Sequence, residues 1–120
     1  EVYLYNKKYK LIIATNGPIV PLKSKLEKLQ IEKYFITVFS AEEVGFMKPH
    51  KEFYKGLLKK SENPVKEKIL FIGDEIEKDI KGGIENNIDT CWCNYNNELK
   101  STIYVPKYEI HKLEELKQIL

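Results

Sequence analysis

Two carboxylates follow the most apolar short segment of the chain. Residues 69–72 read ILFI, and they are followed by Gly73, Asp74 and, five residues further on, Asp79. Such a run is typical of a strand that is buried on both faces of a parallel sheet, which would place Asp74 at the carboxyl edge of that sheet. Two carboxylates near one point suit Mg²⁺, which takes oxygen ligands together with waters and a phosphate oxygen. Alternatively, the acids simply favour a helix N-terminus.

Two further groups of polar residues also follow apolar runs. Thr15, Asn16 and Gly17 come directly after LIIA, and a hydroxyl with free backbone N–H groups at a helix start binds phosphate. The plainer interpretation of that tripeptide is a turn with a capping side chain. Lys48 precedes Pro49, which restricts the lysine backbone and allows its side chain to point inward. Taken alone, Lys48 is equally consistent with a solvated surface lysine.

The three groups together indicate one site. Ligands of parallel α/β sheets bind outside the carboxyl ends of the strands, and each group stands at such an end. A phosphoryl group is negatively charged, so carboxylates alone would repel it. Lys48 and Mg²⁺ would supply the compensating positive charge, and catalysis of phosphoryl transfer is largely positioning and electrostatics. The sequence therefore predicts a site for a phosphoryl group with its metal.

The rest of the chain supplies the elements that would carry this site. Apolar runs predict strands at residues 11–14, 37–40, 69–72, 90–93 and 108–110. Helical patterns are expected over the leucine stripe 22–29, from Pro49 onwards, up to Lys81 before two glycines, and over the leucines 113–120. The residues before Leu11 are expected to be helical. Strands that alternate with helices predict an α/β fold with a mainly parallel sheet.

Composition limits the classes of function. The 120 residues carry 42% hydrophobic and 32% charged side chains, enough for one domain with its own core. A formal charge of +2 is too balanced for a nucleic-acid binder. No apolar run of membrane-spanning length and no signal sequence is visible. Cys91 and Cys93 are expected to be core thiols, and the prediction is a cytoplasmic protein with neither nucleic acid nor membrane as a partner.

These motifs resemble those of the haloacid dehalogenase (HAD) superfamily. LIIATNG resembles its second motif, FMKPHKEFY its third and ILFIGDEIEKDIKGG its fourth, in the same order. DTCWCN and the ending PKYEIHKLEELKQIL are most similar to the branch of pyrimidine 5′-nucleotidases. The resemblance implies a Rossmann-like three-layer core. It also implies a Mg²⁺-dependent phosphatase that hydrolyses nucleoside 5′-monophosphates through an aspartyl-phosphate intermediate.

The resemblance also implies roles for individual residues. Thr15 and Lys48 would be catalytic, the hydroxyl bonding to the phosphoryl group and the ammonium balancing its charge. Asn16 and Gly17 would complete the phosphate-binding turn with their backbone. Asp74 would ligate Mg²⁺, and Asp79 would either ligate it through water or hold Lys48. Aspartate at both metal positions favours a phosphatase over a dehalogenase.

One departure from the family pattern is an absence. The first motif, DxD, which carries the nucleophile, does not occur in the sequence. Residues 1–120 are therefore expected to be a single partial core domain, the C-terminal part of a longer enzyme without its central strand and helical cap. Such a chain should be inactive alone. The gap beside the strand that ends at Thr15 is expected to be filled by the missing N-terminal segment, by a swapped copy of the chain, or by collapse of the sheet.

Two other classes of function remain open. A phosphoryl-receiver signalling domain also uses Asp, Thr and Lys at strand ends, but its acidic pair comes first, whereas here the order is Thr15, Lys48, Asp74. A non-catalytic phosphate-binding domain or pseudo-enzyme would use the same fold without a nucleophile.

Overall fold

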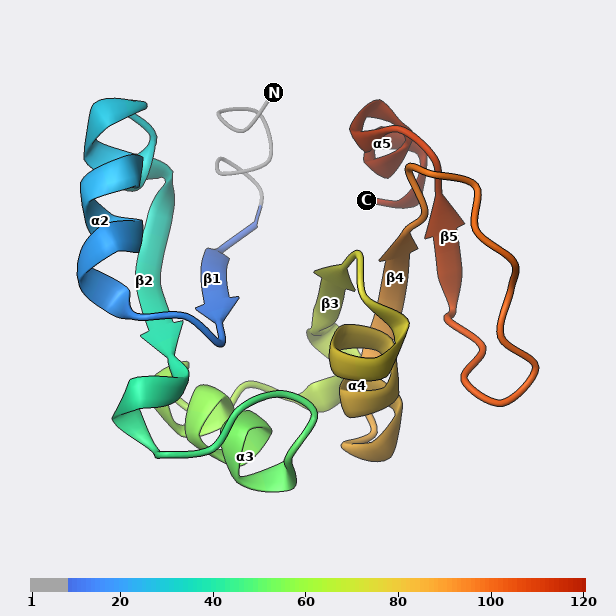
Figure 1. Cartoon of the computed structure of the whole chain (residues 1–120), viewed down its shortest axis with the longest axis horizontal. Coiled ribbons are helices and arrows are strands. Elements are labelled where there is room, and N and C mark those ends of the chain that lie inside the picture. The colour runs from blue at the N-terminus through green and yellow to red at the C-terminus, as the bar shows by residue number, and fades with distance from the viewer. Residues whose placement is uncertain (1–8) are drawn as a thin grey trace.

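The computed structural model describes residues 9–120, which form two small parallel sheets connected by helices (Figure 1). One sheet has the order β1–β2 and the other the order β3–β4–β5. The strands are β1 (Leu11–Thr15), β2 (Phe35–Ser40), β3 (Leu70–Gly73), β4 (Asp89–Cys93) and β5 (Tyr108–Ile110). The predicted strands and the α/β class are thus confirmed. The helix expected before Leu11 falls largely on residues 1–8, outside the described part.

Three of the four α-helices lie between strands in sequence, and the fourth follows β5, as the apolar patterns predict. They are α2 (Ile19–Lys28), α3 (Lys51–Lys60), α4 (Lys81–Glu85) and α5 (Leu116–Ile119). Helix α3 begins two residues after Pro49, because His50 is its N-cap and its Nδ1 accepts the Glu52 N–H at 3.0 Å. Within residues 9–120, no helix combines the length and apolar character that a membrane crossing requires.

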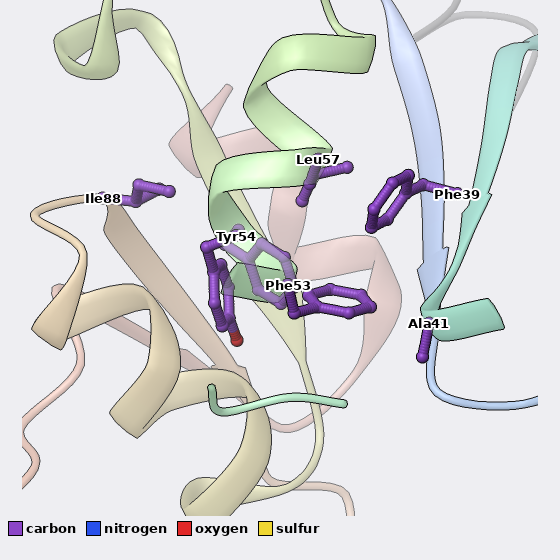
Figure 2. Packing of buried hydrophobic residues seen from close by; sticks show 7 residues of the cluster. Phe39, Ala41, Phe53, Tyr54, Leu57 and Ile88 are labelled. Atoms are coloured by element: carbon purple, nitrogen blue, oxygen red, sulfur yellow. The ribbon is translucent and has the colours of Figure 1, made fainter. Parts of the chain in front are cut away.

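The main core lies around α3 and connects the two sheets. Phe53, Tyr54 and Leu57 project from this helix and are buried, with Phe39 from β2 on one side and Ile88, which precedes β4, on the other (Figure 2). The rings of Phe39 and Phe53 meet edge to face with centroids 5.1 Å apart. The apolar face of α3 therefore holds together two sheets that share no strand pairing among the described residues.

The helix that carries Asp79 extends further than the sequence indicates. It starts as a π-helical turn (Ile76–Ile80) and continues as α4, so that Gly82 and Gly83 lie inside a helix instead of ending it. The reason is close packing. A Cβ atom on Gly82 would overlap the ring and hydroxyl of Tyr54, and one on Gly83 would overlap the Thr90 methyl group. The glycines are needed for contact with neighbouring elements and not for chain reversal.

Strand β3 is less enclosed than its four apolar residues suggest. Phe71 is buried, but the Ile72 side chain is 40% exposed, so the expectation of burial on both faces is wrong. The edge of β3 that faces away from β4 has no strand partner among the described residues, and neither has the edge of β1 that faces away from β2. A cavity of about 500 Å³ lies between these edges. Its walls include Leu11, Ile12 and Ala14 from β1 and Leu70, Phe71 and Ile72 from β3. Of the three expected outcomes for the gap, collapse of the sheet is therefore not observed.

The packing of α4 against Tyr54 gives the first prediction. Alanine normally stabilises a helix interior by about 1 kcal/mol relative to glycine. At Gly82 the added methyl group would meet the Tyr54 ring, and we expect Gly82→Ala to lower the free energy of unfolding by about 1–3 kcal/mol instead. Urea denaturation measures the change, with the exposed Glu85→Ala of the same helix as control. A more stable Gly82→Ala chain would contradict this packing.

Candidate active site

The Lys48 ammonium forms hydrogen bonds to groups at the carboxyl ends of both sheets. Its Nζ donates to Asp79 Oδ1 at 2.8 Å and to the Ala14 carbonyl at 3.3 Å, and its side chain is only 13% exposed. Ala14 belongs to β1, whereas Asp79 follows β3. The ammonium also lies over the rings of Phe53 and Phe71, 5.9 and 5.8 Å from their centroids. The prediction that Lys48 points inward is confirmed.

Asp79 is held from two directions. Its Oδ1 accepts from Lys48, and its Oδ2 accepts the Glu75 backbone N–H at 3.2 Å. Its side chain is 7% exposed. A Cβ atom on Gly73 would overlap this carboxylate, so the glycine at the end of β3 leaves the space that Asp79 occupies. Of the two roles expected for Asp79, the described contacts match the one in which it holds Lys48, and its role as a metal ligand stays a prediction.

The turn after β1 is fixed by side chains from neighbouring elements. The Thr15 hydroxyl accepts the Gly17 N–H at 3.0 Å, which leaves the hydroxyl proton available for donation. The Asn16 side chain contacts the Lys48 backbone, accepting its N–H at 2.7 Å and donating to its carbonyl at 3.5 Å. The predicted phosphate-binding turn and the predicted lysine are therefore in direct contact, although they lie 32 residues apart.

Ser40 is a further member of the site that is not among the predicted site residues. It ends β2 opposite Thr15 in the register and is fully buried. Its hydroxyl donates to the Gly17 carbonyl at 2.7 Å and accepts the Glu42 N–H at 3.1 Å. The FSAEE segment could have revealed it, because a serine followed three residues later by glutamate is the signature of a capping box. The structure contains that box, with Glu43 accepting the Ser40 N–H.

Asp74 lies at the carboxyl end of β3, as predicted, and is exposed to solvent. Its backbone carbonyl accepts the indole N–H of Trp92 at 3.1 Å, and Trp92 is 1% exposed. The described contacts join Asp74 to none of Lys48, Thr15 or Asp79, and residues 9–120 contain no cluster of three or more potential metal-ligating side chains.

Comparison with known protein families identifies the class of protein. The sequence profile of the haloacid dehalogenase-like hydrolase family matches residues 2–93, which is more than half of the chain. The protein belongs to this family, and the resemblance found from its motifs is confirmed.

Individual relatives agree with this assignment. Over 111 residues, the chain is 34% identical to pyrimidine 5′-nucleotidase YjjG of Escherichia coli, covering 92% of this chain and 49% of YjjG. Pyrimidine 5′-nucleotidase PynA of Streptococcus pneumoniae is 34% identical over 113 residues, with coverage of 94% and 48%. A shorter match of 72 residues, at 39% identity, covers 60% of this chain and 31% of a glyceraldehyde 3-phosphate phosphatase from Methanocaldococcus jannaschii. The chain thus spans about half the length of the two nucleotidases.

A solved structure gives the same result for the fold. The crystal structure of the HAD-hydrolase YfnB from Bacillus subtilis, described as bound to magnesium, superposes with a TM-score of 0.95 at 34% identity. The match covers 99% of this chain and 52% of YfnB. The two parallel sheets and their helices are therefore arranged as in a HAD-like hydrolase.

Two ion pairs of equal length allow a test of how much the Lys48 contact stabilises the fold. Lys48–Asp79 and Lys60–Glu43 are both 2.8 Å long, but the side chains of the second pair are 33% exposed. We expect Lys48→Met to lower the free energy of unfolding by about 3–5 kcal/mol, because it leaves a buried carboxylate unpaired. The matched Lys60→Met should cost about 1 kcal/mol or less. Urea denaturation at pH 7 measures both, and equal losses would show that Lys48 is no more important to the fold than a surface lysine.

Proposed function

We propose that this chain carries the phosphate-binding and metal-binding half of a Mg²⁺-dependent phosphatase. The observation that supports this most directly is the donor count of Lys48. An ammonium has three N–H donors, and the described acceptors, Asp79 and the Ala14 carbonyl, use two of them. The third is available for a phosphoryl oxygen at the carboxyl ends of the strands.

The turn after β1 would complete the phosphate site. The Thr15 hydroxyl can donate to a second phosphoryl oxygen while it accepts from Gly17. Gly17 donates its own N–H to Thr15, so its contribution is to shape the turn, and the Asn16 backbone N–H would be the donor to phosphate. Thr15 and Lys48 would then stabilise the charge that builds up on the transferring group.

Asp74 would hold the metal. Its carboxylate oxygens are hard ligands, and the side chain is exposed and has no described ion pair. Proteins bind Mg²⁺ through one or two carboxylates, and the ion keeps several waters and phosphate oxygens as its other ligands. The residues present therefore fit Mg²⁺. When bound, the ion would offset negative charge on the phosphoryl group. We propose that Asp79 acts on Lys48 and that Asp74 supplies the carboxylate ligand, and the magnesium in the YfnB structure supports this choice of ion.

The nucleophile would come from a strand outside residues 9–120. HAD-type hydrolysis through an aspartyl-phosphate intermediate needs an aspartate in the DxD motif, which this sequence lacks. The open edges of β1 and β3, with the apolar cavity between them, suit one additional strand whose end would lie beside Lys48. We propose that a missing N-terminal segment supplies it, so the chain is inactive alone. A swapped copy of this chain is the alternative source.

We propose nucleoside 5′-monophosphates as the substrate class. This proposal is supported by the similarity to YjjG and PynA, which are both named pyrimidine 5′-nucleotidases and whose alignments cover more than 90% of this chain. Glyceraldehyde 3-phosphate is the second candidate, since phosphatases of that name match 60% of this chain at 39% identity in one case and 90% of it at 27% identity in another.

Complementation tests the proposed function. The chain is co-purified with the half of YfnB that it does not match, and release of phosphate from UMP, AMP and glyceraldehyde 3-phosphate is measured with and without Mg²⁺. We expect Mg²⁺-dependent hydrolysis that is fastest with UMP, and none from the chain alone. Lys48→Ala in the complex should lower kcat by about a hundredfold or more, because one preformed charge contact at the transferring group is lost.

The metal assignment has its own matched pair of variants. Asp74→Asn should abolish the Mg²⁺-dependent hydrolysis, whereas Glu77→Gln, an exposed acid of the same segment, should leave it unchanged. A complex that forms, binds inorganic phosphate and yet hydrolyses nothing would replace this proposal with a non-catalytic phosphate-binding domain.

The cavity between the sheets gives a separate prediction. Ile72 lines it and is 40% exposed, so Ile72→Asp should leave the chain folded but weaken assembly with the YfnB half by at least about tenfold, because a charge would be buried against apolar atoms. Ile36→Asp on β2, 56% exposed and outside the cavity, is the control. Analytical ultracentrifugation measures both affinities. Equal weakening by the two variants would argue against this cavity as the binding surface, and self-association of the chain alone would favour a swapped copy.

A further inference from the structure

Tyr54 is a fully buried titratable side chain that the proposed chemistry does not use. It projects from α3, is 0% exposed, and its hydroxyl donates to the Lys78 carbonyl at 2.8 Å. Burial, and next the negative charge of Asp79, raise the pKa of Tyr54 above its ordinary value. The hydroxyl therefore remains a neutral donor at physiological pH, in the immediate neighbourhood of the site carboxylate.

The acceptor of this bond belongs to the same peptide unit as the backbone nitrogen of Asp79. The Lys78 carbonyl and the Asp79 N–H lie in one planar group, because the peptide bond between them cannot rotate. The N–H side of that group donates to the Glu75 carbonyl at 2.8 Å, and the carbonyl side accepts from Tyr54. The peptide that begins Asp79 is thus held at both ends, within the π-helical turn Ile76–Ile80.

The Tyr54 ring packs against the two rings over which the Lys48 ammonium lies. Its centroid lies 5.5 Å from that of Phe53 and 5.3 Å from that of Phe71. Gly82 leaves the space that the ring and hydroxyl occupy. One side chain therefore contacts the backbone that carries the carboxylate and the aromatic surfaces beside the ammonium.

We propose that Tyr54 is a positioning residue of the site: its hydroxyl orients the peptide of Asp79, and Asp79 in turn holds the Lys48 ammonium at the end of β1. The importance of this for catalysis rests on the proposed function, whereas the effect on Lys48 itself does not. Tyr54 touches no reacting group in this scheme and acts only through Asp79.

The test measures the reactivity of Lys48 in the 120-residue chain, without substrate or metal. Tyr54→Phe keeps the ring and removes the hydroxyl. Competitive acetylation at pH 8, read by peptide mass spectrometry, gives a separate rate for each lysine. We expect the Lys48 rate to rise roughly threefold to tenfold, the factor that corresponds to the loss of one neutral hydrogen bond. The Lys60 rate should not change, because its hydrogen-bond partners are Glu43 and the Val38 carbonyl, neither of which bonds to Tyr54 or Asp79.

Two comparison variants separate positioning from a general loss of stability. Leu57→Ala weakens the same buried cluster without touching the hydroxyl, and Tyr104→Phe removes a tyrosine hydroxyl elsewhere. Neither should raise the Lys48 rate relative to the other lysines. An unchanged Lys48 rate in Tyr54→Phe, a uniform rise at all lysines, or an equal selective rise in Leu57→Ala would each overturn the proposal. Because no turnover is measured, failure of the phosphatase assignment would leave this result interpretable.

Discussion

A largely buried ammonium with acceptors at the carboxyl ends of two separate sheets is the interaction on which the rest of this structure depends. Lys48 cannot leave water without partners, and its partners are a carbonyl at the end of β1 and a carboxylate beyond the end of β3. Satisfying both brings the carboxyl ends of the two sheets together. The Asn16 side chain, paired with the Lys48 backbone, and the two rings over which the ammonium lies restrict the lysine further. The same restriction produces a prearranged anion site, since little reorganisation would be needed when a phosphoryl group arrives.

The apolar core achieves the same connection by different means. Side chains of helix α3 pack against both sheets. Its aromatic residues Phe53 and Tyr54 are fully buried between Phe39 of β2 and Ile88, which precedes β4 (Figure 2). Hydrophobic packing is not directional, so it can join the sheets while the backbone edges of β1 and β3 remain unpaired. Those edges border an apolar cavity, and unpaired strand edges of this kind are ready templates for pairing with a further strand. The architecture and the proposed chemistry thus point to the same missing element, a strand that would also carry the nucleophile.

Close packing around glycines couples the core to the site. Gly73 leaves space for the Asp79 carboxylate, and Gly82 leaves space for Tyr54, whose hydroxyl reaches the peptide of Asp79. In both cases the requirement comes from a neighbouring side chain and not from an unusual backbone angle. Interiors packed at this density transmit small displacements, so a side chain added at either glycine is expected to disturb the ion pair at the site.

The sequence by itself determined the elements and indicated candidate site residues. Apolar runs and turn residues are local signals, which is why all five strands appear close to their predicted positions and why Thr15 and Asp74 stand at strand ends. The order of the motifs was also sufficient to indicate the HAD family, which the family match confirms.

Only the tertiary structure decided what depends on contacts between distant residues. The Asn16 side chain pairs with Lys48 across 32 residues, Ser40 anchors the turn after β1, and Trp92 bonds to the Asp74 carbonyl, none of which leaves a periodic trace in the sequence. The prediction that the helix ends before Gly82 and Gly83 is wrong. Glycine is locally a helix-breaking residue, but here its role is set by close contact with Tyr54 and Thr90. Likewise, ILFI indicated burial on both faces, but how far a strand is covered depends on its neighbours in the sheet, and the described residues leave one edge of β3 open.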